Sequence, residues 1–334
     1  LRGGSHAEEL VATAKALGLD AIAVTDRNTL AGVVRAHLAA KQVGLQLVVG
    51  ARLDLQDAPS LLCLPTDREA YARLSRLLSL GQRRAEKGKC LLGLDDLALH
   101  AEGQILIALV PEAWDWRETV PAETVEERSE IIPIASAGCR QAVPRPAVEG
   151  AFKSALGRLR ERLAPAGLYL AASHTCRGDD RARIAALARL AEQTGLPLVA
   201  TGSVLYHTPG RRELQDVLTA IREKTTVAAA GFRLEANAER HLKSPAEMGR
   251  LFRGHEGAVA LTVEIARRCR FCLDELVYEY PDEPVPQGKT PHGHLEELTS
   301  EGARWRYPDG VPETIRATIA RELTLIAELH YAPY

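Results

Sequence analysis

Short apolar strands alternate with amphipathic helices along most of this sequence, and that alternation limits its fold more than any other feature. The apolar runs are short and rich in Val, Ile, Leu and Ala, which favours buried strands, whereas the stretches between them carry apolar residues at helical spacing. The predicted strands cover residues 20–25, 46–50, 52–55, 60–64, 104–110, 167–172 and 197–201. The predicted helices cover residues 5–17, 29–43, 66–78, 151–163, 180–194 and 211–223. This order predicts an α/β fold, with βα units around a mostly parallel sheet that is either open or closed into a barrel.

Several helix starts carry capping signals. Ser5 with Glu8, and Thr66 with Glu69, have the spacing of a capping box, in which each side chain binds the other residue's backbone N–H. Ser244-Pro245 predicts a further helix start, with proline at the first helical position.

The sequence also suggests where the chain divides. Residues 111–150 are rich in Pro and Glu without clear periodicity, so we interpret them as a loop-rich insertion. Prolines and acidic residues at 278–286 disfavour continuous helix or strand and predict a linker. Two helices follow, near 291–303 and 312–329. We therefore predict three parts: residues 1–275, a linker at 276–290, and a mainly helical segment at 291–334.

Composition excludes some functions. The formal net charge of −2 argues against a free-standing nucleic-acid binder, which usually carries excess Lys and Arg. No apolar run approaches the roughly 20 residues that span a bilayer, so no membrane partner is expected. Met248 is the only methionine, and we interpret the chain as a piece of a longer protein. Six cysteines without an evident pairing pattern favour a reducing, cytoplasmic setting: Cys63, Cys90, Cys139, Cys176, Cys269 and Cys272.

Several blocks of the sequence resemble one known family. Residues 18–50 (GLDAIAVTDRNTLAGVVRAHLAAKQVGLQLVVG) resemble the second motif of the polymerase-and-histidinol-phosphatase (PHP) domain. Residues 61–89 are similar to the next block of its DNA polymerase III alpha-subunit version. The blocks that resemble the error-prone branch of that family are 196–222, 237–243, 268–286 and 306–312.

The resemblance implies a distorted, TIM-like β/α barrel at 1–275, followed by the first helices of the polymerase palm. It implies DNA and deoxynucleoside triphosphates as substrates of the parent enzyme, Mg²⁺ as its cofactor, and repair or replication proteins as partners. The palm carboxylates that hold two Mg²⁺ ions for phosphoryl transfer would lie beyond Tyr334. No catalytic residue is therefore assigned in this chain.

PHP phosphoesterases hold several metal ions on His and carboxylate ligands at the C-terminal ends of their strands, and the resemblance shows which residues stand at those positions here. The first motif, His-x-His, would precede Leu1. The second, commonly Thr-Asp-His, keeps Asp26 but has Arg27 in the histidine position. The third commonly ends in Gly-x-Glu, whereas this chain has Arg52 in the carboxylate position.

The late Asp-x-His motif has lost both of its ligands. Ser203 and Leu205 occupy their positions. His207 lies two residues further on and by strand alternation could face the same side, so partial compensation stays open. Because two arginines entering a cation site repel divalent ions, we predict that the site is lost and that the fragment binds no metal.

Other potential ligands are interpreted as structural. His37 lies in the middle of a predicted helix and is expected on its surface or in packing, and His174 near Cys176 is expected in a loop. Cys269 and Cys272 have the C-x-x-C spacing of a zinc knuckle, but no second pair accompanies them. His292 and His294 head the helix after the linker and are expected to cap or solvate it.

Three functions are weighed on these grounds. The preferred hypothesis is a catalytically silent PHP domain that braces an error-prone DNA polymerase, with residues 1–334 alone inactive. The first alternative is an active metal-dependent 3′–5′ exonuclease or phosphoesterase. The second is a protein-interaction module that recruits repair partners.

Overall fold

The computed structural model describes residues 2–111, 114, 146–164, 166–276 and 284–333. The chain divides into two compact units, Leu1–Glu275 and Leu276–Tyr334. Most of the predicted insertion at 111–150, and residues 277–283 of the predicted linker at 276–290, lie outside the described residues.

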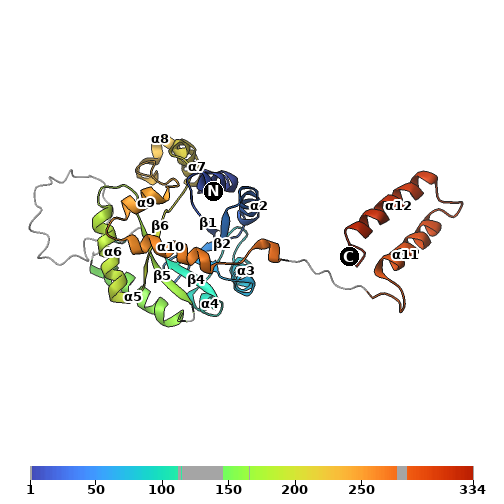
Figure 1. Ribbon diagram of the computed structural model, residues 1–334, viewed down its shortest axis with the longest axis horizontal. Helices are drawn as coiled ribbons and strands as arrows, with labels where there is room; N and C mark the ends of the chain where they lie inside the picture. The colour runs from blue at the N-terminus through green and yellow to red at the C-terminus, as the bar shows by residue number, and fades with distance from the viewer. Residues whose placement is uncertain (1, 112–113, 115–145, 165, 277–283, 334) are drawn as a thin grey trace, which may run out of the picture. The chain divides into compact units, whose positions relative to one another are not determined.

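The first unit is built around one six-stranded mixed sheet that curls into a half-barrel (Figure 1). Its strands follow one another in chain order: β1 (Ala21–Arg27), β2 (Gln46–Leu53), β3 (Leu61–Pro65), β4 (Gln104–Ala108), β5 (Gly167–Ser173) and β6 (Leu198–Thr201). β1 pairs with β2 in parallel, as β4 does with β5 and β5 with β6. β3 runs antiparallel to both of its neighbours. The expected α/β class and barrel-like curl are therefore confirmed.

Two details of the sheet differ from the prediction. Residues 46–50 and 52–55 were predicted as separate strands, but residues 46–53 form the single strand β2, which ends before residues 54 and 55. Position 50 has no room for a side chain because the neighbouring strand β3 passes closely. A Cβ on Gly50 would lie 2.8 Å from the carbonyl oxygen of Cys63. β3 reverses direction because the connection over residues 54–60 is too short for the crossover that a parallel strand requires.

Helices surround this sheet. Their bounds are α1 (Ala7–Ala16), α2 (Val33–Val43), α3 (Arg68–Arg83), α4 (Leu94–Ala98), α5 (Pro146–Arg162), α6 (Asp180–Thr194), α7 (Arg212–Arg222), α8 (Val227–Ala230), α9 (Pro245–Leu251) and α10 (Glu256–Arg268). Short 3₁₀ turns cover Pro209–Arg211, Gly231–Arg233 and Leu273–Glu275.

Both faces of the sheet are apolar, as expected of a sheet that is buried on both sides. Leu106 and Ala108 of β4 pack in the cluster that holds the buried residues of α3, α4, α5 and α6. Ile105 and Ile107, which alternate with them, pack in another cluster with Ile265 of α10. Successive side chains of β4 therefore pack in two different apolar clusters.

The capping box predicted from Ser5 and Glu8 is wrong by one residue. His6 is the N-cap of α1, and its backbone N–H donates to Oε2 of Glu9 at 2.9 Å. The Ser5 hydroxyl is unavailable for the cap because it bonds His207 across the fold, Oγ to Nδ1, at 2.7 Å.

The box predicted from Thr66 and Glu69 is displaced in the same way. Asp67 caps α3 by accepting a hydrogen bond from the backbone N–H of Ala70 at 2.8 Å. The Thr66 hydroxyl instead donates to the carbonyl oxygen of Gly103 at 2.8 Å. By contrast, the Ser244 cap is confirmed, with Pro245 at the first turn of α9.

The second unit contains two helices, α11 (Pro291–Arg306) and α12 (Glu313–Glu328), which contact each other. Thr290 caps α11 by accepting the backbone N–H of Gly293 at 3.1 Å. Neither helix has a fully buried residue. Among the described helices of both units, none is long and apolar enough to cross a membrane.

Candidate functional site

The C-terminal edge of the sheet is the place to look for a site, because β1, β2, β4, β5 and β6 all run in the same direction. Loops that leave these strand ends bring polar side chains from distant parts of the chain together, as in other α/β folds. The six residues predicted for a degenerate metal site all belong to β1, to β2 or to the stretch after β6.

Asp26, near the end of β1, caps the next helix. Its Oδ2 accepts a hydrogen bond from the backbone N–H of Gly32, the N-cap residue of α2, at 2.8 Å. Gly32 allows this approach, since a Cβ there would lie 2.6 Å from the same oxygen. A carboxylate at a helix N-terminus is favoured by the helix dipole. This geometry occupies one oxygen of Asp26 with backbone structure.

Arg27 and Arg52 are neighbours across the parallel pair of β1 and β2. Both pair with the carboxylate of Asp54: an Nη of Arg27 lies 3.1 Å from Oδ2, and Nε of Arg52 lies 2.8 Å from Oδ1. Ser60 completes the group by donating to Oδ1 at 2.7 Å. From sequence, Asp26 was expected either to cap a helix or to pair with Arg27 or Arg52. It caps α2, whereas both arginines pair with Asp54.

The environment of Asp54 favours its charged form. Burial opposes ionisation, but the hydrogen bonds from Ser60 and Arg52 and the charges of Arg52 and Arg27 outweigh it, so the pKa of Asp54 is lowered. The carboxylate of Asp54 thus faces two guanidinium groups at this pair of strand ends.

Ser203 and Leu205 lie just beyond β6 and are held by Arg240. Nε and an Nη of Arg240 donate to the carbonyl oxygen and to Oγ of Ser203, at 2.8 and 2.7 Å. The backbone N–H of Leu205 donates to the carbonyl oxygen of Arg240 at 2.8 Å. Ser203 has a φ of 47°, a left-handed conformation that is uncommon outside glycine.

His207 faces the N-terminal segment. Its backbone N–H donates to Oγ of Ser5 at 3.0 Å, which leaves the Ser5 hydroxyl hydrogen free to donate to Nδ1 of the ring. Nδ1 also lies 4.0 Å from Oε2 of Glu9. The imidazole is therefore fixed by two residues that sequence reasoning had not linked to it.

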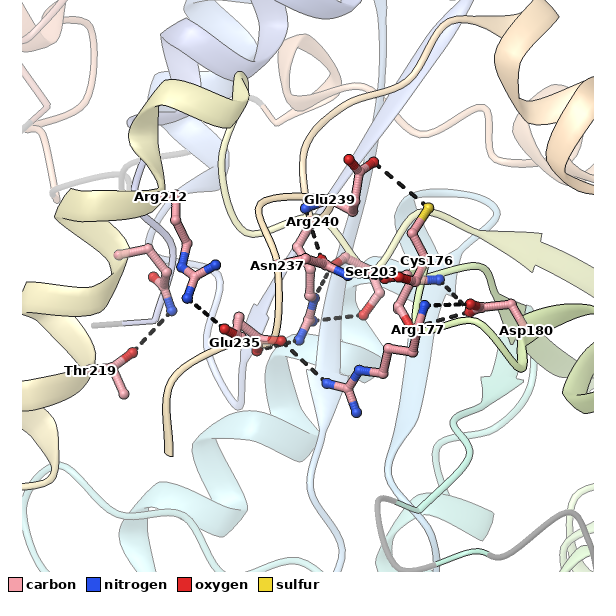
Figure 2. Close-up of polar contacts among 12 residues, drawn as sticks. Cys176, Arg177, Asp180, Ser203, Arg212, Thr219, Glu235, Asn237, Glu239 and Arg240 are labelled. Carbon is pink, nitrogen blue, oxygen red and sulfur yellow. Dashed lines mark hydrogen bonds and ion pairs between the residues drawn. The ribbon is translucent and has the colours of Figure 1, made fainter. Parts of the chain in front are cut away.

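Residues 235–243, which we call the crossing segment, tie the loops after β5 and β6 together (Figure 2). Asn237 donates from Nδ2 to the carbonyl oxygens of Thr175 and Cys176, both at 2.9 Å. Glu235 accepts from an Nη of Arg240 at 2.7 Å and lies 3.5 Å from an Nη of Arg177. No site residue was predicted in this segment, although its density of charged residues is visible in the sequence.

Lys243 places a buried cation in the same segment. Its side chain is 5 % exposed, and Nζ donates to Oε2 of Glu239 at 2.9 Å and to Nε2 of His241 at 3.0 Å. The hydrogen bond from Lys243 is the largest reason that the pKa of Glu239 is lowered. Cys176 Sγ lies 3.7 Å from the same Oε2. The carboxylate of Glu239 and the imidazole of His241 therefore bind an ammonium group.

Comparison with known proteins decides the family. The model of the PHP domain matches residues 1–170, which is more than half of the chain. The chain belongs to the PHP family.

Relatives of this PHP protein match it over its full length. The error-prone DNA polymerase of Caulobacter vibrioides is 48 % identical, and the error-prone DNA polymerase 2 of Rhizobium meliloti is 43 % identical. The chain spans only 28 % and 27 % of the length of these two relatives. An amidohydrolase structure from Chromobacterium violaceum, with bound sulfate, aligns over 61 % of this chain and 84 % of its own at 13 % identity and a TM-score of 0.38.

The PHP family implies a site for divalent metal ions at this edge, and the residues present do not fit one. Asp26 offers a carboxylate, but it caps α2. Arg27 and Arg52 bring positive charge, and Ser203 is bound by Arg240. Hard divalent ions need several anionic or neutral oxygen and nitrogen donors directed at one point. No metal-dependent step is therefore derived for this PHP edge.

Proposed function

We propose that this chain is the N-terminal part of an error-prone DNA polymerase, in which a degenerate PHP unit supports the polymerase core instead of cutting DNA. The full-length matches to relatives of that name support the parentage, and so does the small share of their length that the chain spans. The observation that carries the supporting role is the pairing of Arg27 and Arg52 with Asp54, at positions where a PHP enzyme binds metal.

The parent enzyme would transfer nucleotides from deoxynucleoside triphosphates to a primer on damaged DNA, in repair and replication, in the cytoplasm. Its Mg²⁺-binding palm carboxylates would lie beyond Tyr334, with 291–334 as the start of the palm and 1–275 as the PHP unit. The crossing segment supports a bracing role, because its ion pairs and hydrogen bonds join loops that a catalytic site would leave open for substrate.

The first experiment tests for catalysis by residues 1–334. The purified protein is incubated with a labelled primer and template in Mg²⁺ or Mn²⁺, and we expect neither extension nor 3′–5′ degradation. Asp26→Ala serves as the site variant, and Asp20→Ala, an exposed aspartate just before β1, as its matched control. Degradation that survives Asp20→Ala and disappears in Asp26→Ala would show an active nuclease and refute the proposal.

The second experiment tests support in the intact polymerase. Arg240→Ala removes the contact between the crossing segment and Ser203 without touching the palm. We expect the thermal midpoint and the yield of folded enzyme to fall, while the rate of extension per folded molecule stays unchanged. A loss of rate at unchanged stability would instead indicate that the PHP edge takes part in the reaction.

A further inference from the structure

A second group of potential metal ligands lies away from the C-terminal edge. Nε2 of His37, on α2, is 3.2 Å from Oδ1 of Asp274, in the 3₁₀ turn that follows α10. Cys272 joins them, and one ligand atom from each of the three residues lies within 4.8 Å of the other two. Within the described ranges, no other group of three His, Cys, Asp or Glu side chains meets this criterion.

The three donors are held from two sides by packed structure. α2 buries Ala36 and Ala40, which flank His37 on the helix. The ring of Phe271, next to Cys272, is 4 % exposed and stacks on Tyr71 with centroids 4.3 Å apart. Gln46 donates from Nε2 to the carbonyl oxygen of Cys269 at 3.1 Å. The donors are therefore positioned before any ligand arrives, which lowers the entropic cost of binding.

The chemistry of the donors favours one class of ion. An imidazole nitrogen, a thiolate sulfur and a carboxylate oxygen form a mixed set that suits Zn²⁺, whereas Mg²⁺ and Ca²⁺ prefer oxygen alone. Zinc is usually four-coordinate, so three protein ligands would leave one position for water.

A lysine competes for the same carboxylate. Nζ of Lys41, one turn after His37, lies 3.0 and 3.2 Å from the two oxygens of Asp274. The carboxylate of Asp274 therefore accepts hydrogen bonds from both Lys41 and His37. Lys41 is 64 % exposed, so its ammonium can move into solvent when an ion with two charges takes its place.

We propose that His37, Cys272 and Asp274 form a zinc-binding site in which the metal replaces the ion pair between Lys41 and Asp274. The prediction that the chain binds no metal then applies only to the C-terminal edge of the sheet. Because Asp274 lies in the last turn of the first unit, bound zinc would fasten that turn to α2, immediately before the segment that leads to the second unit. The proposal does not depend on the polymerase assignment.

The test uses Co²⁺ as a spectroscopic probe for zinc in the reduced protein of residues 1–334. We expect about one equivalent to bind with a thiolate-to-cobalt charge-transfer band, and Zn²⁺ to displace it. Cys272→Ser should abolish the band and weaken binding at least about tenfold, the loss seen even when outer partners of ligands are removed. Cys176→Ser, at an exposed cysteine outside the proposed site, is the control and should keep the band.

Two further variants keep the result interpretable. His37→Gln should keep the thiolate band but weaken binding, and Lys41→Met should strengthen binding because the competing ammonium is gone. Zn²⁺ should raise the thermal midpoint of the wild type but not of Cys272→Ser, since only a site in the folded state stabilises it. The proposal is overturned if micromolar Co²⁺ gives no band in the wild type, or if the band persists in Cys272→Ser.

Discussion

Arg240 holds Ser203 at two points, donating from Nε to the carbonyl oxygen at 2.8 Å and from an Nη to Oγ at 2.7 Å. From sequence, Ser203 is predicted to stand at the position of an aspartate ligand of PHP phosphoesterases. We propose that the guanidinium group of Arg240 holds this edge of the sheet in place of a metal ion. Glu235 balances the charge of Arg240 at 2.7 Å.

The first prediction concerns this contact. Arg240→Ala should lower the free energy of unfolding by about 1.5–3 kcal/mol, because it removes charged hydrogen bonds and leaves Ser203 in a left-handed conformation without support. Urea unfolding measures the change. Arg240→Lys, which keeps the charge but not the two-point geometry, should lose a smaller share. A loss within about 0.5 kcal/mol for Arg240→Ala would show that the contact carries little stability.

The second prediction concerns acid stability at Asp54. The folded-state pKa of Asp54 is lowered, so its ionised form contributes stability that is complete above the unfolded pKa, near 3.8. That contribution should fall as the pH drops below about 4 toward the folded-state value. The wild type should therefore exceed Asp54→Asn in stability at pH 7, and the difference should shrink as the pH falls from 5 to 3.

Denaturant unfolding across this pH range checks the Asp54 prediction, with Glu69→Gln as the control. The side chain of Glu69 is 86 % exposed, so its removal should leave the pH profile close to that of the wild type. A difference between wild type and Asp54→Asn that stayed constant from pH 7 to pH 3 would mean that ionisation of Asp54 is not the source of the stability.

The strands of the fold could be predicted from sequence because each is a local apolar run. The strand predicted at 167–172 is β5 (Gly167–Ser173), and the helix predicted at 180–194 is α6 (Asp180–Thr194). The capping boxes failed because the hydroxyls of Ser5 and Thr66 are engaged in long-range contacts that no local pattern contains. The local sequence predicted a helix cap in each case, whereas the same hydroxyl forms a long-range hydrogen bond in the folded chain.

The partners at the site were harder to predict for a related reason. Arg27 was expected just after the strand predicted at 20–25, and Arg52 within the strand predicted at 52–55. Their shared carboxylate comes from Asp54, just after the end of β2. Arg240 reaches Ser203 over a sequence separation of 37 residues. Which of several nearby carboxylates or carbonyls a long side chain binds depends on the direction of the backbone after the strand ends. The spacing of residues in the sequence does not show that direction.

The third prediction concerns thiol reactivity. Burial raises the pKa of the Cys269 thiol to about 11 and also raises that of Cys63, which is fully buried, whereas Cys176 is exposed. In the folded protein, iodoacetamide should label Cys176 at least about 100-fold faster than Cys63, because labelling of Cys63 requires an opening that costs several kcal/mol. Mass mapping after timed labelling measures both rates, and urea should remove the difference. Comparable labelling of both thiols in native buffer would show that the core around β3 is loosely packed.

The fourth prediction concerns the division of the chain at residue 275. The described apolar clusters lie entirely within the first unit, whereas α11 and α12 bury no residue fully. A protein of residues 1–275 should therefore unfold with a thermal midpoint within about 2 °C of that of residues 1–334, since a shift of that size corresponds to less than about 1 kcal/mol in a unit this large.

A peptide of residues 284–334 should be only partly helical by circular dichroism, because short helices without a buried face are marginal in water. Limited proteolysis of residues 1–334 should likewise release a stable product that ends between 276 and 290. A midpoint lowered by more than about 4 °C in residues 1–275, or first cleavage within 18–50 or 196–222, would show that the core has been placed in the wrong part of the chain.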